Sequence, residues 1–248
     1  MPQVSSPTLL AIDAAGERCS LALVHAAGSE CCTGAPGQTH LEHVMPMVEQ
    51  LFARCSLRPR DCDAFAFASG PGSFTGLRVA CTIVQGLALG AGRPVIAVGH
   101  LDALLRAGLD AGPGTAAGGA AAPLARALVL LDARMEQAYW AVHGKRDSAW
   151  ASLAAPAVGG RDELLRAIEQ WQPDFCAGDA AWILRYIGAV DVPVRDVAVE
   201  AGVVARLAQE RFARGALLAP ERAVPMYVRD RVAQTVAERR DARSGRPA

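Results

Sequence analysis

A glycine turn between a strand and a helix is the first place in this sequence where residue types and spacing could do chemistry. Residues 64–68 alternate alanine with phenylalanine and predict a strand, Gly70-Pro71-Gly72 forms the turn, and a helix follows from about Phe74. The free N–H groups at a helix start attract anions, so this arrangement could cradle a phosphate. The plain alternative is a tight turn that starts a buried helix.

Neither familiar phosphate-loop spacing is met. A P-loop requires a lysine after its second glycine, and none follows Gly76; the dinucleotide fingerprint requires glycine where Thr75 stands. Ser73 and Thr75 could serve as nucleophiles only with a neighbouring base, and the sequence identifies none. These hydroxyls fit better as caps of the following helix.

Other titratable side chains are too isolated to predict a site. His40 and His43 are spaced for one helix face, but they begin a helix and are interpreted as solvated. His100 follows a strand, and a single imidazole does not make a metal centre. Glu17 and Glu136 have no nucleophile to assist. The sequence therefore predicts no catalytic residue, no metal and no cofactor.

Composition narrows the class of protein. The chain has 248 residues, 52% of them apolar, and its 25 basic residues balance 25 acidic ones, so no overall basic field attracts nucleic acid. Seven cysteines without a Cys-x-x-Cys pair favour reduced thiols. The first twelve residues lack the pattern of a signal peptide, and the longest uncharged helical stretch, Val79–Gly92, is shorter than the ~18 residues of a membrane span. We expect a cytoplasmic protein with no membrane segment.

The chain divides into two similar halves. In the first half, strands are predicted at 9–13, 19–25, 30–33, 64–68 and 95–98, with helices at 39–55, 74–89 and from 101. A Gly/Ala/Pro-rich linker covers 108–123. In the second half, helices are expected at 162–171, 180–187, 200–214 and 231–240, strands at 174–177 and 192–196, and an extended segment at 220–228.

The first strand pair recurs after the linker. Residues 9–24 (LLAIDAAGERCSLALV) align without a gap with residues 128–143 (LVLLDARMEQAYWAVH). The identical pairs include Asp13 with Asp132 and Glu17 with Glu136. A strand that ends in aspartate, a tight turn and a second strand therefore occur twice, which indicates a duplicated domain.

The helix at 74–89 is apolar on nearly every side. Arg78, Thr82 and Gln85 alone interrupt it, and glycines at 76 and 86 would let another helix approach closely. Such a helix must be covered all round. It lies either between the sheet and a second layer of the same chain, or between the sheet and a partner protein.

The repeated strand–Asp–hairpin resembles the actin-like ATPase superfamily, which has a two-lobed, ribonuclease H-like fold with duplicated βββαβαβα domains. The resemblance implies an α/β protein whose two hairpins face each other across a nucleotide cleft, with Asp13 and Asp132 near the metal. Those hairpins usually carry glycine beside the aspartate, so that amides reach the phosphates. Here Ala14-Ala15-Gly16 and Ala133-Arg134-Met135 follow, so the nucleotide site is expected to be degenerate.

A narrower resemblance covers residues 9–233. The segments HLEHVMPMVEQLF, SGPGSFTGLRVACTIVQGLALG, PVIAVGHLDALL and AVPMYVRDRVA, together with the two hairpins, are similar to the TsaB (YeaZ) family. The resemblance implies a non-catalytic partner of the threonylcarbamoyltransferase TsaD in forming threonylcarbamoyladenosine beside the tRNA anticodon. It further implies an assembly with the ATPase TsaE, only indirect contact with tRNA, and a possible homodimer. TsaD-like enzymes hold metal with His-x3-His where this chain has His100 and Leu104.

In that family the first two helices of the N-terminal lobe meet the partner. The partner surface is accordingly expected at Leu41, Val44, Val48, Leu77, Ala80 and Val84, and a large charged residue at position 80 is expected to block pairing without unfolding the chain. The expected divisions are an N-terminal lobe at 1–107, a C-terminal lobe at 108–220, and a segment at 221–248 that packs back on the first lobe. The alternatives are an ATP-dependent carbamoyl- or phosphotransferase that uses Asp13 and Asp132 and, with less support because Leu104 replaces the second histidine, a metallopeptidase.

Overall fold

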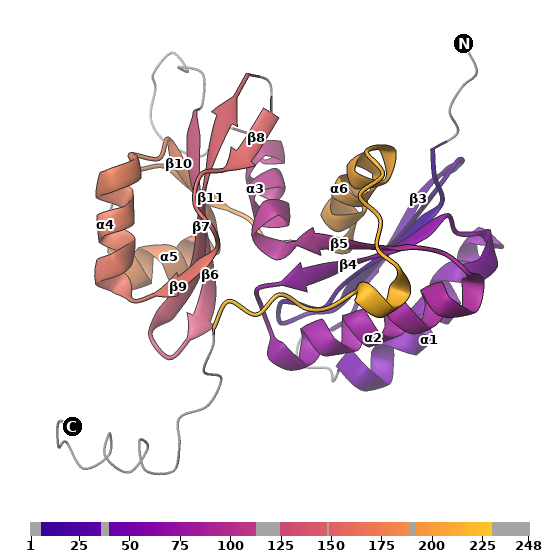
Figure 1. The fold of residues 1–248 in the computed structure, drawn as a ribbon. Helices are drawn as coiled ribbons and strands as arrows, with labels where there is room; N and C mark the ends of the chain where they lie inside the picture. Colours follow the sequence, from indigo (N-terminus) through magenta and orange to yellow (C-terminus); the bar gives the residue numbers. More distant parts are fainter. Residues whose placement is uncertain (1–5, 36–39, 113–124, 148, 189–191, 230–248) are drawn as a thin grey trace, which may run out of the picture.

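Two mixed sheets form two lobes that lie side by side (Figure 1). This computed structural model describes residues 6–35, 40–112, 125–147, 149–188 and 192–229. The first sheet has the order β3-β2-β1-β4-β5 and the second β11-β10-β6-β7-β8, with β9 also paired to β7. The strands of the first sheet are β1 (Leu9–Asp13), β2 (Ser20–His25), β3 (Gly28–Thr33), β4 (Ala64–Gly70) and β5 (Val95–Gly99). Those of the second are β6 (Arg126–Arg134), β7 (Gln137–Arg146), β8 (Ala149–Ser152), β9 (Ala157–Gly159), β10 (Phe175–Gly178) and β11 (Val194–Asp196).

The helices follow the predicted order in each half. They are α1 (His40–Cys55), α2 (Phe74–Ala91), α3 (His100–Asp110), α4 (Arg161–Trp171), α5 (Ala180–Ile187) and α6 (Ala201–Ala213). The predicted βββαβαβα duplication is therefore confirmed, with β9 as an additional strand in the second half. The predicted helix at 231–240 lies outside the described residues.

Helices cover both faces of the first sheet, and alternate side chains of each strand point to opposite faces. Leu10 and Ile12 of β1 pack in a cluster with α1 and α2, whereas Leu9 and Ala11 pack in another with α6. At about 25 cal/mol per Å² of apolar area buried, these two layers supply much of the stability of the lobe.

The third helix of each half packs on the sheet of the other half. Helix α3 places Leu101, Leu104 and Leu105 against Val129 and Phe175 of the second sheet. Helix α6, which is late in the sequence, covers the first sheet (Figure 1). The expected division at 107 and 220 therefore does not match the packing: α3 belongs with the second sheet and α6 with the first. Sequence order alone gave no signal of this exchange.

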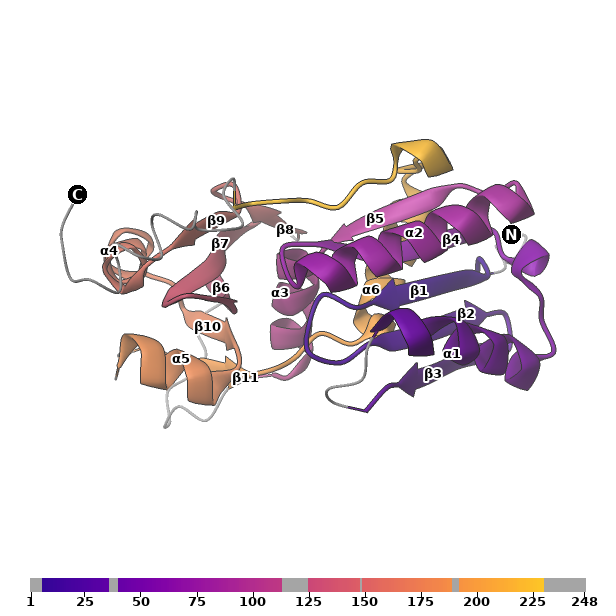
Figure 2. The same ribbon diagram turned by 90° about the horizontal axis from the view of Figure 1, so that it is seen from below.

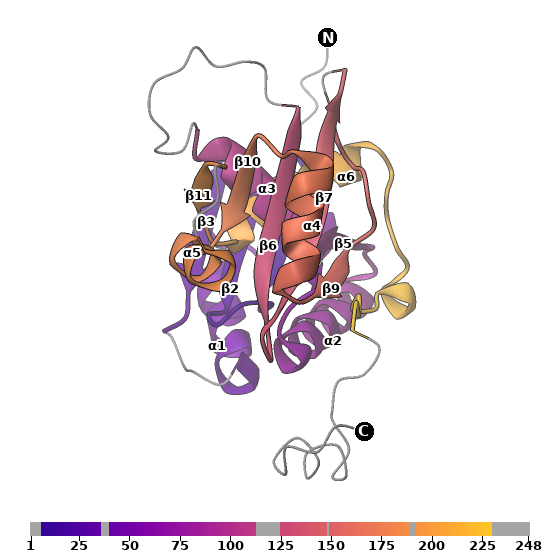
Figure 3. The ribbon, with the colours of Figure 1, turned by 90° about the vertical axis from the view of Figure 1, so that its left-hand side faces the viewer.

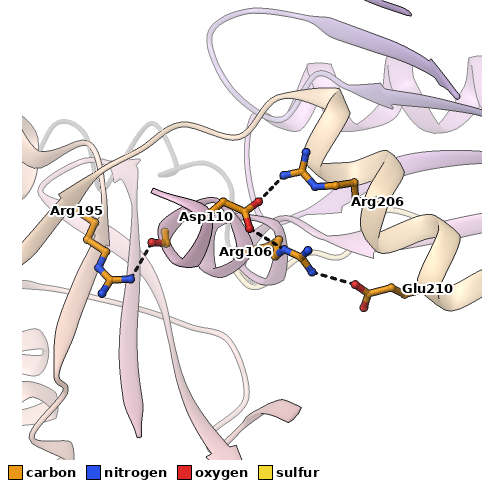
Figure 4. A network of polar contacts seen from close by, with 6 residues as sticks. Arg106, Asp110, Arg195, Arg206 and Glu210 are labelled. Carbon is orange, nitrogen blue, oxygen red and sulfur yellow. Dashed lines mark hydrogen bonds and ion pairs between the residues drawn. The ribbon is translucent and has the colours of Figure 1, made fainter. Parts of the chain in front are cut away.

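A polar network joins the two exchanged helices (Figure 4). Arg106 of α3 pairs with Asp110 at 3.0 Å and with Glu210 of α6 at 2.9 Å, and Arg206 of α6 pairs with Asp110. At the end of α3, Arg195 Nη1 of β11 donates to Gly108 O at 2.9 Å, and its guanidinium lies 3.7 Å from the Phe175 ring centroid. Each partly exposed pair contributes little alone, but together they fix α3 against α6.

After α6 the chain forms a strap, residues 215–229, that runs along the first lobe and reaches the second (Figure 2). Leu218 pairs with Val95, Ala223 is buried beside α2, and Met226 N donates to Ser69 O at 2.6 Å. Arg229 then donates to Ala133 O and Gln137 Oε1 of the second lobe at 3.0 and 2.7 Å.

Helix α2 is the one helix among the described residues that is long and apolar enough to cross a membrane, with 18 residues and a mean hydropathy of 1.4. The uncharged stretch considered in the sequence was shorter because it began after Arg78. One face of α2 packs on the first sheet, and the core helix of a globular domain passes the same test of length and composition.

The exchanged packing predicts which truncations fold. A chain that ends after residue 198 keeps every strand of the first sheet but loses α6, so the apolar face that includes Leu9, Ala11 and Ile96 becomes exposed. We expect it to aggregate or to lose the cooperative unfolding of the full-length protein. Circular dichroism melting and solubility check this. An unchanged melting curve for the shorter chain would contradict the assignment of α6 to the first lobe.

Candidate functional site

The two repeated hairpins use the same local turn. In the first, Asp13 Oδ1 accepts the N–H of Ala15 at 3.0 Å; in the second, Asp132 Oδ1 accepts the N–H of Arg134 at 2.7 Å. Each aspartate thus bonds the amide two residues ahead, an Asx turn that lets the strand reverse direction. The two hairpins that are repeated in the sequence therefore also share the same aspartate-to-backbone hydrogen bond. Asp13 is 2% exposed.

The hairpins meet across the two lobes through one ion pair. Arg134 Nη2 lies 2.9 Å from Glu17 Oε1, and Arg134 Nη1 lies 3.2 Å from Asp132 Oδ2. The guanidinium of Arg134 therefore pairs with Asp132 of the same hairpin as well as with Glu17 of the other. Arg134, Met135 and Glu136 all adopt positive φ, between 54° and 62°, where ATPase relatives would be expected to have glycine. In the part of the chain that the structure describes, no cluster of three His, Cys, Asp or Glu side chains could hold a metal.

The glycine turn is packed against its own chain. A Cβ added at Gly72 would lie 2.6 Å from Ala15 O, and one at Gly70, whose φ is +116°, would lie 2.6 Å from Met226 O of the strap. Ser73 N donates to Ala15 O at 2.8 Å, and Ser73 Oγ accepts the N–H of Gly76 at 3.3 Å. The interpretation as a tight turn with a capping serine is thus favoured over a phosphate cradle, because protein atoms occupy both sides of the turn.

His100 has a structural role at the start of α3. Its Nδ1 lies 3.0 Å from Pro71 O, and the ring is 4% exposed. Leu104, at the position of the second histidine of a His-x3-His pair, is buried against the second sheet. His43 lies elsewhere, in a hollow between β3 and α1 that Cys32 and Met47 also line. The seven cysteines are all unpaired.

The residues predicted to form the partner surface point into the first lobe. Val44, Val48, Leu77, Ala80 and Val84 are at most 2% exposed, in contact with the sheet; the side chain of Leu41 lies outside the described ones. Because a fully buried side chain cannot contact another protein, these residues form the inner layer of α1 and α2. The expectation that a large charged residue at position 80 leaves the fold intact is corrected for the same reason.

The outer faces of the same two helices carry different residues. Met45 of α1 is 39% exposed and Leu89 of α2 is 74% exposed, and Thr82, Gly86 and Gly90 are also exposed on α2. Nothing lies within 4 Å of a Cβ built at Gly86 or Gly90. We call Met45, Thr82, Gly86, Leu89 and Gly90 the outer helix face. The sequence carried a weak signal for this side of α2, because Arg78, Thr82 and Gln85 recur at helical spacing along it, but the apolar and small residues around them obscured it.

A second polar cluster joins both lobes to α3. Asp102 accepts from His143 Nε2 of β7 at 3.2 Å and from Arg211 Nη2 of α6 at 2.9 Å. Burial alone would raise the pKa of Asp102, but hydrogen bonding and charge from His143 and Arg211 outweigh it and hold the pKa below its ordinary value. The cluster is a structural clamp rather than an acid–base site.

Comparison with known proteins places the fold and hairpins in a family. A model described as "TsaD: tRNA N6-adenosine threonylcarbamoyltransferase" matches residues 36–172. The protein named TsaB from Escherichia coli K12 is 29% identical over 91% of this chain and 96% of its own length. The structure of YeaZ from Pseudomonas aeruginosa is 30% identical, covers 89% of this chain and 99% of its own, and superposes with a TM-score of 0.74. This chain belongs to the TsaB (YeaZ) family.

Family membership confirms the predicted two-lobed, actin-like α/β fold. A shorter match relates part of the chain to an enzyme: the tRNA N6-adenosine threonylcarbamoyltransferase of Maricaulis maris is 43% identical over 65 residues, 26% of this chain and 17% of that enzyme. This TsaB-family chain thus shares part of its scaffold with that enzyme, while its hairpins and glycine turn are closed by its own residues.

The inward position of Ala80 predicts unequal effects on stability for two neighbouring substitutions. Ala80→Glu buries an unpaired carboxylate and should lower the free energy of unfolding by about 4 kcal/mol or more. Thr82→Glu, on the outer helix face, should change it by less than about 0.5 kcal/mol. Urea unfolding followed by circular dichroism measures both. Equal stabilities of the two variants would show that α2 is turned differently on the sheet.

The Asp102 clamp predicts a pH-dependent contribution to stability. Because the folded pKa of Asp102 is lowered, its stabilisation is fully present above the ordinary aspartate pKa, near 4, and is lost as the pH falls through the lower folded value. Asp102→Asn should therefore cost about 1 kcal/mol at pH 7, and the difference from the parent should be smaller at an acidic pH below the ordinary aspartate pKa. Urea midpoints at both pH values test this; a constant difference would contradict it.

Proposed function

We propose that this chain is a non-catalytic partner that activates a TsaD-like threonylcarbamoyltransferase in forming threonylcarbamoyladenosine on tRNA. The family supports the pathway, since the E. coli relative is named a tRNA threonylcarbamoyladenosine biosynthesis protein. The matched family model supports the kinship with the catalytic paralogue. The proposal places the protein in the cytoplasm, where its tRNA substrate is, with a TsaE-like ATPase completing the assembly.

The packing of the glycine turn carries the non-catalytic assignment. A phosphate cradle needs open space in front of free amides. Here Ser73 N already donates to Ala15 O, and the backbone of Ala15 and Met226 lies where side chains at Gly72 and Gly70 would project. The Glu17–Arg134 pair joins the two hairpins across the lobes. These contacts argue against the rival enzyme that would use Asp13 and Asp132.

The outer helix face is the proposed meeting point with the partner. It combines exposed apolar side chains at Met45 and Leu89 with Thr82, Gly86 and Gly90, beside which the backbone of another helix could come close. Its residues are not needed for the core of the first lobe. A TsaD-like chain is the proposed occupant, and a second copy of this chain would use the same face when no such partner is present.

A reconstituted reaction tests the function. Threonylcarbamoyl transfer to tRNA, assayed with a TsaD-like enzyme, a TsaE-like ATPase and the adenylate synthase, should require this chain. It should also tolerate Asp13→Ala combined with Asp132→Ala, provided that the variant is folded. Loss of transfer in a folded variant that still pairs would restore the enzyme interpretation, and transfer without this chain would refute the proposed role.

A matched pair of arginine substitutions tests the pairing surface. Leu89→Arg on α2 should weaken binding to the TsaD-like partner at least tenfold, because a charge would be desolvated in an apolar contact. Leu184→Arg on α5, where the leucine is 47% exposed, is the control and should leave binding unchanged. Titration by isothermal calorimetry and the elution volume of each mixture provide the measurement. Equal binding by both variants would remove the outer helix face from the proposal.

A further inference from the structure

A basic cleft lies at the far end of the second lobe. It is a hollow of about 430 Å³ where β6 begins, β7 ends and α4 ends, with Arg126, Lys145, Arg146, Gln170 and Trp171 among its lining residues. Figure 3 shows α4 lying along β6 and β7 of this sheet. The cleft belongs to neither the hairpins nor the outer helix face. Lys145 is the only lysine of the sequence.

The strand pairing brings Arg126 and Arg146 to the face of the sheet that α4 covers, whereas Lys145 lies at the same edge with its side chain on the opposite face. Arg126 pairs with Gly144 in the β6–β7 register, and Lys145 N donates to Ala125 O at 2.7 Å, so the start of one strand holds the end of the other. Arg126 Nη1 donates to Trp171 O at 2.8 Å, which fixes its guanidinium at the C-terminal end of α4. Arg126 and Arg146, which are 20 positions apart in sequence, thus share one wall because the hairpin folds back.

The charge of the cleft is available to a ligand. Among the described residues, neither Lys145 nor Arg146 has a carboxylate partner, in contrast to Arg106, Arg134 and Arg206. The nearby acids do not line the hollow. Asp174 Oδ2 accepts the N–H groups of Ala125 and Arg126 at 2.7 and 2.8 Å. Asp147 follows the lining residue Arg146 in the sequence, and Glu169 precedes the lining residue Gln170.

An indole beside exposed cations suits an RNA strand. Phosphates pair with Lys and Arg, and any of the four bases, when unpaired, can stack on an aromatic ring. Trp171 is half-buried at the cleft, next to the amide of Gln170. We propose that the basic cleft binds the phosphate backbone of the tRNA substrate, with an unpaired base against Trp171. This inference rests on the proposed function and replaces the expectation of only indirect tRNA contact.

Charge removal with a matched control tests the cleft. The cleft variant carries Arg126→Gln, Lys145→Gln and Arg146→Gln; the control variant carries Arg60→Gln, Arg93→Gln and Arg185→Gln, which removes the same charge from exposed positions elsewhere. Binding of unmodified tRNA is measured by fluorescence anisotropy over a range of KCl concentrations, with the full-length chain alone and with its TsaD-like partner. The cleft variant should bind about tenfold or more weakly, with a salt slope smaller by roughly 2. The control variant should resemble the parent, and equal weakening of both would overturn the proposal.

Trp171 and Lys145 allow two sharper measurements. Trp171→Leu should weaken binding without changing the salt slope, since stacking releases no counterions. An amine-directed diazirine on Lys145, which lies at the rim of the cleft on the opposite face of β7, should reach bound tRNA and crosslink to it under ultraviolet light, and Lys145→Arg should abolish that crosslink while binding persists. The N-terminal amine also takes the label, so only the Lys145-dependent crosslink counts. Failure of labelled Lys145 to crosslink to bound tRNA would overturn the proposal.

The reconstituted reaction separates this inference from the proposed function. If transfer requires this chain and the cleft variant raises the KM for tRNA while still pairing with the TsaD-like enzyme, the cleft assignment is supported. If transfer requires this chain but the cleft variant has the parental KM, the cleft fails and the proposed function stands. If transfer does not require this chain, both fail together.

Discussion

The exchange of the third helices is the constraint on which the rest of the structure depends. Each sheet has only one apolar face covered by its own half of the sequence: α6 closes the other face of the first sheet and α3 closes the other face of the second. The two helices then meet through Arg106, Asp110, Arg206 and Glu210. Since each lobe lacks a layer without the other, the lobes hold each other in one arrangement, and the two hairpins are held facing each other.

That arrangement explains why the two hairpins and the glycine turn are packed against residues of the same chain. With the lobes fixed by α3 and α6, Glu17 and Arg134 are within ion-pair distance, and the strap passes beside the glycine turn before it reaches the second lobe at Arg229. The exposed ion pair contributes little stability by itself. The backbone contacts at Gly70 and Gly72 matter more, because they fill the volume that a phosphate would need.

The surfaces left free are consequently those that face outward from the two lobes. The inner layer of α1 and α2 is committed to the sheet, so a partner can meet only their outer helix face. On the second lobe, the basic cleft has cations that no described carboxylate neutralises. A protein that holds a catalytic paralogue with one lobe and RNA with the other would position the substrate without performing chemistry itself.

The sequence by itself determined the element order, the duplication and the family. Strand and helix periodicity, the repeated Asp13 and Asp132 turns, and the stretch from Gly70 to Gly90 depend on local spacing, which one chain displays directly. Tertiary structure decided which side of α2 is outside, because Arg78, Thr82 and Gln85 give only a weak signal among the apolar and small residues around them. It also decided that α6 completes the first lobe and that Arg126 joins Arg146, since burial and non-local strand pairing are set by long-range packing rather than by neighbours in sequence.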